Sequence, residues 1–428
     1  MADRIIISFD DDDNSPDEKK NEKSKGIDIT SDIPENREVM DEKIRINKDK
    51  DKILGSEISC LYKSNTEQNS FFISDLEYPS GVDKGFNLNY SIDLNDEFFS
   101  SIIYNNRFFV LTSAASKVYL IDRFNPESQF SFFIENQIFE KTGLILKNDI
   151  YLNSLRSIFC IKNTEIITPD DLKTIYTSPD DYYIWTNLNY FKNKISFVEY
   201  NNNTSDANFK LIDKDNGNVD YQYSFKINKF LYDNILITGN ILFLISDNSI
   251  LVISFDENFK AVINSFNSGF EINIETQFAI IRNKLFFNNL SGEIYYFDIN
   301  KILSTVHYSG IRCSYLNSLA GFDNYLFAGH LSGWKLFNTN GNLIFAHNDV
   351  DENKIEALNR NTLVVSKFNK IFFHNLNRFQ EAEGFAIIPE GNEKSRIISA
   401  VVSFNNIYVL TKNGIFESYS NERLNIHL

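Results

Sequence analysis

The stretch Phe322–Ile344 reads FDNYLFAGHLSGWKLFNTNGNLI and contains two short apolar runs separated by turn residues. Tyr325–Ala328 and Trp334–Phe337 are the apolar runs, and Leu331–Gly333 is the turn between them. This pattern predicts a β-hairpin. Because two strands alone cannot bury their apolar faces, a hairpin that recurs along a chain indicates blades packed side by side around an axis.

The same hairpin recurs through most of the chain, at intervals of about 37 to 47 residues, which is the period of a propeller. The roughly 20 residues between hairpins contain further apolar runs, so we expect four strands in each blade. The sequence therefore predicts an all-β fold, a single β-propeller of about eight blades, with seven blades as the alternative. The other copies are Asn105–Asp122, Lys147–Lys162, Lys192–Asp213, Gly239–Asp256, Arg282–Ile299, Asn359–Leu376 and Phe404–Ser420.

A ring of blades must be closed, because an open ring leaves unpaired strand edges. Only Asn421–Leu428 follow the last hairpin, so we expect the missing strand to come from the N-terminal side. The apolar runs Ile58–Tyr62 and Phe71–Ile73 are the predicted sources. Phe86–Leu94 alternates like a half-buried strand and is expected to lead into the first blade.

The composition and charge of the chain exclude several kinds of partner and site. The chain has 428 residues, 43% of them hydrophobic and 14% aromatic, and a net charge of −16. Such a charge argues against a nucleic-acid partner and against anionic membranes, since both bind clustered Lys and Arg. No apolar span of about 20 residues is present, and no secretion signal is visible, so we expect a soluble cytoplasmic protein without membrane insertion. Its three cysteines are widely spaced, which argues against disulfides and metal clusters.

The first 57 residues differ from the rest of the chain. Residues 10–57 are rich in Asp, Glu, Lys, Asn and Ser, so a disordered acidic arm is predicted for residues 1–57 and the propeller for residues 58–428. Residues 4–9 form a short apolar peptide ahead of an acidic run, which suggests a docking strand built on Ile5, Ile6, Ile7 and Phe9. Docking onto another protein and docking onto this protein's own propeller both stay open.

The repeats resemble those of PQQ-like (quinoprotein-dehydrogenase-like) propellers, in which a strand ends on Asp and a Gly turn follows. Lys210–Asn218 (KLIDKDNGN) and Leu336–Leu343 (LFNTNGNL) carry this resemblance, and Gly329-His330 with Trp334 is similar to WD-repeat chemistry. The quinoprotein enzymes hold their cofactor between a Trp and a vicinal cysteine pair, and this chain has no adjacent cysteines. The resemblance therefore implies the non-enzymatic use of the fold, as an interaction platform in a multiprotein assembly, with no cofactor.

Several residues are candidates for a site. The insertion that includes Asn201, Asn202 and Asn203 lengthens one hairpin loop, and loops on a rigid scaffold are where binding usually occurs. His330 ends a strand and is expected to cap the following turn, and it is also a candidate for a side chain that faces the central channel. His307 and Arg312 lie in HYSGIRCSY, which we interpret as entering an inner strand with side chains facing the channel.

No stretch of the sequence carries a catalytic signature. The chain has no GxSxG elbow, no P-loop, no HExxH and no pair of histidines at metal-ligand spacing. No catalytic, cofactor-binding or metal-binding residue is predicted, and the protein is not expected to be an enzyme. The predicted function is a scaffold or adaptor for protein–protein interaction, with a flexible acidic tether, as a subunit of a larger assembly. The alternative is an enzyme or small-ligand sensor that uses the central channel.

Overall fold

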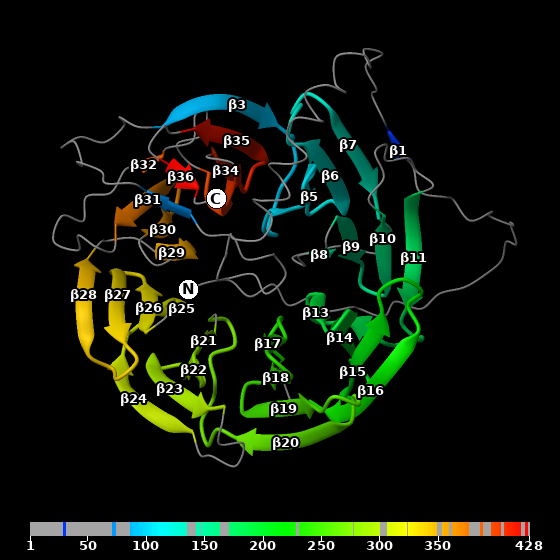
Figure 1. The fold of residues 1–428 in the computed structure, drawn as a ribbon, viewed down its shortest axis with the longest axis vertical. Coiled ribbons are helices and arrows are strands. Elements are labelled where there is room, and N and C mark those ends of the chain that lie inside the picture. The colour runs from blue at the N-terminus through cyan, green and yellow to red at the C-terminus, as the bar shows by residue number, and fades with distance from the viewer. Residues whose placement is uncertain are drawn as a thin grey trace, which may run out of the picture.

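The structure is a computed structural model that describes residues 29–30, 71–73, 86–134, 143–146, 148–162, 171–227, 231–276, 278–299, 306–322, 324–348, 353–358, 362–375, 386–387, 395–403, 406–420 and 424–426. These residues form strands and turns arranged as eight blades around a central axis (Figure 1). The predicted all-β propeller is confirmed, and the count is eight blades, not seven. The predicted docking peptide, residues 4–9, lies outside the described residues.

Each blade is an antiparallel sheet, and in blades 1 to 7 the strand order follows chain order from the axis to the rim. Blade 1 consists of β4 (Ile103–Tyr104), β5 (Phe108–Thr112), β6 (Lys117–Asp122) and β7 (Gln129–Phe133). Blade 2 consists of β8 (Leu144–Leu146), β9 (Asp149–Asn153), β10 (Ser157–Ile161) and β11 (Leu172–Thr177). In blade 3 the innermost position is divided between β12 (Tyr183–Ile184) and β13 (Asn189–Phe191), followed by β14 (Lys194–Asn201), β15 (Asp206–Asp213) and β16 (Val219–Lys226).

The second half of the ring repeats this order. Blade 4 consists of β17 (Leu236–Thr238), β18 (Ile241–Ile245), β19 (Ser249–Phe255) and β20 (Ala261–Asn267). Blade 5 consists of β21 (Ala279–Ile281), β22 (Lys284–Asn288), β23 (Glu293–Asp298) and β24 (His307–Arg312). Blade 6 consists of β25 (Leu316–Phe322), β26 (Tyr325–His330), β27 (Gly333–Asn338) and β28 (Leu343–Asn348). Blade 7 consists of β29 (Asn353–Leu358), β30 (Thr362–Lys367), β31 (Lys370–Asn375) and β32 (Ala386–Ile387).

Blade 8 closes the ring with strands from both halves of the chain. Its order is β33 (Ile397–Ser403), β34 (Asn406–Thr411), β35 (Ile415–Ser420) and then β3 (Asn87–Asp93) at the rim. The prediction that the closing strand comes from the N-terminal side is confirmed, but its predicted source was wrong. The closing strand is β3, whereas β2 (Phe71–Ile73) pairs with β36 (Leu424–Ile426) in a separate two-stranded sheet. Ile58–Tyr62 lie outside the described residues.

One further short strand extends blade 1. β1 (Ile29–Thr30), from within the predicted acidic arm, pairs with the outer edge of β7. The remaining residues of that arm lie outside the described part of the chain.

All eight hairpins predicted from the sequence form the second and third strands of their blades. Their continuous apolar runs follow from burial on both faces: every residue of β5 is buried, for example. The outermost strands instead alternate between half-buried and exposed residues, as β3 and β16 do, because one face meets the neighbouring blade and the other meets solvent. Position in the blade thus decides which hydrophobic period a strand carries.

The hydrophobic core is divided into eight clusters, and each cluster lies between two neighbouring blades. The cluster between blades 8 and 1 is rich in aromatic rings, with Phe109 4.2 Å from Tyr408 and 5.4 Å from Phe416 between ring centroids. The junction where the chain closes on itself is therefore packed like the other seven. This makes the ring a rigid base for its loops.

Candidate binding face

The antiparallel order of the strands divides the loops between two faces of the ring. Turns between the second and third strands, and connections from one blade to the next, leave from the same ends of the strands. We call this end of the ring the loop face and the other end the opposite face. Three of the predicted candidate positions lie on the loop face: the turn that begins at Asn201, His330 at the end of β26, and Arg312 at the end of β24.

The turn after Asn201 is shaped by that residue's own side chain. The Oδ1 atom of Asn201 accepts hydrogen bonds from the backbone N–H groups of Asn203, at 2.9 Å, and Thr204, at 3.2 Å. Asn201 is buried, while Asn202 and Asn203 are exposed. Asn201 therefore fixes the loop, and the two following asparagines present their amide groups to solvent.

His330 caps a turn, as expected, but it ends β26, the second strand of blade 6, and not the inner strand β25 that borders the channel. Its Nδ1 atom accepts a hydrogen bond from the backbone N–H of Ser332 at 3.1 Å, and burial lowers the pKa of the imidazole. A neutral ring is the form that accepts this bond. His330 thus stabilises the tight turn that leads into Gly333, whose φ of 123° lies in the region that favours glycine.

His307 and Arg312 do not lie on an inner strand, and that interpretation of HYSGIRCSY was wrong. Both belong to β24, the outermost strand of blade 5, and both side chains are exposed. His307 stacks on Tyr296 with 5.2 Å between ring centroids. The physical reason is the short connection at residues 313–315, which passes from the rim of blade 5 to the inner strand of blade 6, so the inner strand begins only at Leu316.

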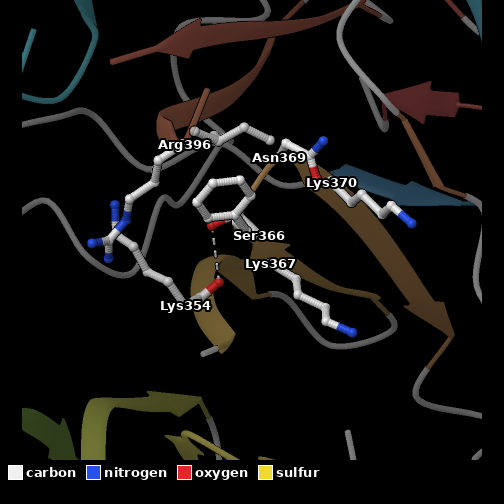
Figure 2. A pocket seen from close by; sticks show the side chains of 8 residues that line it. Lys354, Ser366, Lys367, Asn369, Lys370 and Arg396 are labelled. Carbon is white, nitrogen blue, oxygen red and sulfur yellow. Dashed lines mark hydrogen bonds between the residues drawn. The ribbon is translucent and has the colours of Figure 1, made fainter. Parts of the chain in front are cut away.

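A cavity of about 540 Å³ opens on the loop face at blades 7 and 8 (Figure 2). Four cationic side chains line it, although the chain as a whole has a net charge of −16. Figure 2 shows the side chains of Lys354 and Arg396 pointing to one side of the pocket, and those of Lys367 and Lys370 to the other. The lining residues, which we call the cationic pocket, are Lys354, Ser366, Lys367, Phe368, Asn369, Lys370, Arg396 and Ile397.

Two of these lysines face each other across the β30–β31 hairpin. Lys367 and Lys370 are directly paired in the strand register, an arrangement in which like charges destabilise a sheet. Phe368 lies in the turn between them with a φ of 48°, which is unusual for a bulky side chain, and it is 51% exposed. The backbone oxygen of Phe368 accepts a hydrogen bond from the N–H of Ile397 at 2.7 Å, which joins the turn to blade 8.

A buried carboxylate lies beside this pocket. Glu356 accepts hydrogen bonds from the Ser366 hydroxyl, at 2.6 Å, and from the backbone N–H of Ala400, at 3.3 Å. The Nζ atom of Lys354 lies 3.3 Å from Glu356 and donates a hydrogen bond to the backbone oxygen of Ile398 at 2.9 Å. These contacts hold Lys354 in place and connect blades 7 and 8.

The loop face also carries exposed apolar side chains on neighbouring blades. Leu290 is 64% exposed, Tyr315 is 76% exposed and Leu331 is 44% exposed, and each lies in a turn or connection of blades 5 and 6. Phe368 continues this series on blade 7. Exposed apolar groups gathered on one face of a folded protein are typical of protein-binding surfaces.

The sequence offered only weak signals for these features. The local signal is KFNK at residues 367–370, which has an aromatic residue between two lysines at the centre of a predicted hairpin. Lys354 and Arg396 are far from that turn in the sequence, and only the order of strands across blades 7 and 8 brings them to it.

Metal sites and membrane-spanning helices are both absent from the described part of the chain. No group of three or more His, Cys, Asp or Glu side chains there is arranged to hold a metal ion. Within the same ranges, no helix has the length and apolar character needed to cross a bilayer.

Comparison with known proteins supports the fold only. No protein-family model matches the sequence. No curated protein matches it either. Among solved structures, the chain is similar to BamB from Moraxella catarrhalis, with a TM-score of 0.55 and 12% identity over 80% of this chain and 99% of that one. It is also similar to the computationally designed Ika8 protein, with a TM-score of 0.52 and 12% identity over 76% of this chain and 96% of that one. The chain thus shares the architecture of these two proteins.

Proposed function

We propose that this protein is a non-catalytic scaffold for protein–protein interaction, which binds its partner through the loop face of blades 5 to 8. The observation that carries the proposal is the series of exposed apolar side chains on that face, at Leu290, Tyr315, Leu331 and Phe368. An eight-bladed ring with packed junctions supplies a rigid support for them, which lowers the entropy cost of binding. The similarity in fold to BamB and the resemblance to PQQ-like repeats are consistent with this use of a propeller.

The proposal includes a place in a larger assembly in the cytoplasm. The thiols of Cys160 and Cys313 are buried and unpaired, and burial raises the pKa of both, which keeps them in the unreactive protonated form. Such cysteines suit a reducing compartment. The excess of acidic residues supports a protein partner over a nucleic acid.

The alternative function, catalysis or ligand sensing in the central channel, draws less support from the inner strands. β8, β17, β21 and β33 consist of aliphatic residues with a few alanines, serines and a threonine. Among the described innermost strands, only β29 contributes Lys, Arg, His or a carboxylate, through Lys354 and Glu356. Catalysis in a channel requires several convergent ionisable groups.

Affinity purification with paired variants tests the proposal. Tyr315→Ser together with Leu331→Ser removes two exposed apolar groups from the loop face. Leu343→Ser together with Ile344→Ser is the matched control, because these residues are 55% and 42% exposed on the same blade but follow the turn at its opposite face. We expect partners captured by the wild type and the control to be lost from the loop-face variant. Equal capture by all three proteins would contradict the proposal.

A further inference from the structure

We infer that the cationic pocket binds an extended acidic peptide segment of the partner protein. The inference rests on the proposed function and names the chemistry of one part of the interface. It starts from charge: four cationic side chains line a cavity of about 540 Å³ in a chain whose net charge is −16, and one of the four, Lys354, is already paired with Glu356. A pocket whose charge is opposite in sign to that of the whole protein attracts anions to one place on the surface.

The layout of the charges favours a peptide over a small anion. Lys354 and Arg396 point to one side of the pocket, while Lys367 and Lys370 point to the other (Figure 2). A single phosphate contacts cations that converge on one point. An extended chain that carries several carboxylates can reach Arg396 on one side and Lys367 and Lys370 on the other, because its side chains are spread along its length, whereas Lys354 is already bonded to Glu356 and Ile398.

The hairpin that forms one wall of the pocket carries two cationic side chains and an aromatic residue in an unusual backbone conformation. Lys367 and Lys370 are directly paired in the strand register, and Phe368 is placed in a left-handed conformation with its ring half-exposed. Carboxylates of a bound peptide would lie close to both ammonium groups of this register pair. The exposed ring of Phe368 supplies apolar contact for an aliphatic or aromatic side chain of the same peptide. Local strain of this kind is concentrated at binding sites.

Fluorescence anisotropy on the full chain tests the inference directly. The probe is a labelled glutamate-rich peptide with one central phenylalanine, and the control probe carries glutamine in place of glutamate. We expect the acidic probe to bind, with an affinity that falls as salt is raised, and the neutral probe not to bind. Binding of both probes with equal affinity would overturn the inference.

Charge reversal in the pocket is compared with charge reversal elsewhere. Lys367→Glu together with Lys370→Glu is expected to weaken probe binding about tenfold. Lys226→Glu together with Lys260→Glu changes the net charge equally at exposed positions outside the pocket, and we expect a change of less than about twofold. An equal loss in both double variants would show that only the overall charge matters and would overturn the inference.

Two single variants distinguish weaker probe binding at the pocket from weaker binding caused by unfolding of the protein. Lys370→Glu creates an opposite-charge pair with Lys367, so we expect the melting temperature to rise while probe binding weakens about threefold. Phe368→Gly places glycine at a φ of 48°, which glycine adopts readily, and we expect weaker binding without a lower melting temperature. Undiminished binding in both variants would overturn the assignment of the site to this hairpin.

Other occupants of the pocket are distinguished by two further measurements. Displacement of the probe by micromolar inorganic pyrophosphate would overturn the peptide assignment in favour of a small anion. Tighter probe binding after Asp10–Asp13 are replaced by Asn in the full chain would overturn the partner assignment, because the chain's own acidic residues would then be the competing occupant. If the probe fails to bind while partner capture still depends on Tyr315 and Leu331, the inference fails and the proposed function stands.

Discussion

Ring closure by β3 can be tested by removing that strand. A chain that begins at Leu94 lacks β3, whereas a chain that begins at Phe86 keeps it. β3 places Leu88, Tyr90 and Ile92 half-buried against the core. Together, the burial of these side chains contributes about 3 kcal/mol to the free energy of unfolding. Loss of the backbone hydrogen bonds to β35 adds about 1 kcal/mol for each bond.

Removal of β3 should therefore lower the free energy of unfolding by on the order of 5 kcal/mol or more, which is a large part of the stability of an ordinary domain. Because the unfolding entropy of a propeller of roughly 340 residues is about 0.7 kcal/mol/K, the melting temperature should fall by about 7 °C or more. The bared edge of β35 should also promote association. Thermal unfolding and size-exclusion chromatography of the two chains measure both effects. Equal melting temperatures and equal elution as monomers would refute closure by β3.

Three further predictions follow from single sites. Gly333→Val should destabilise the protein by about 1 to 3 kcal/mol, measured by thermal unfolding, because valine does not readily adopt a φ of 123°. Glu199→Gln should lower the free energy of unfolding, measured by chemical denaturation, by about 3 to 5 kcal/mol, because it leaves Lys210 buried without the carboxylate that lies 2.6 Å away. Replacement of both residues, Glu199→Leu together with Lys210→Met, should lower it much less. Burial, with a smaller effect of His347, lowers the pKa of His374 to about 3, so the unfolded chain takes up this proton at a higher pH than the folded chain. The contribution of neutral His374 to the free energy of unfolding should be fully present above about pH 6.5 and should be lost as the pH falls toward 3. In His374→Asn, the free energy of unfolding, measured by chemical denaturation, should therefore depend less on pH over this range than in the wild type.

The fold could be predicted largely from the sequence because its repeating unit is local. The second and third strands of each blade are joined by a short turn and are buried on both faces, so each hairpin is visible as two apolar runs. The direction of closure followed from how little sequence remains after Ser420. The closing strand was misassigned because Phe86–Leu94 alternates like any half-buried strand, and alternation does not reveal which blade a strand joins.

The candidate site was less accessible to sequence reasoning. His330 was interpreted correctly as a turn cap because its role depends on Ser332 and Gly333, which are near in the sequence. Arg312 was placed on the wrong strand, because a three-residue connection hides the step from the rim of one blade to the centre of the next. The cationic pocket combines residues from three separate segments, and no local pattern marks such a combination.

Hydrogen–deuterium exchange of the full chain, with and without a partner captured as described above, tests the central claim most directly. The loop-face turns are residues 289–292, 313–315, 331–332 and 368–369, and the opposite-face turn of blade 6 is residues 339–342. We expect the partner to slow exchange in the loop-face turns and to leave residues 339–342 unchanged. Protection confined to the opposite face, with none at the loop-face turns, would contradict the account.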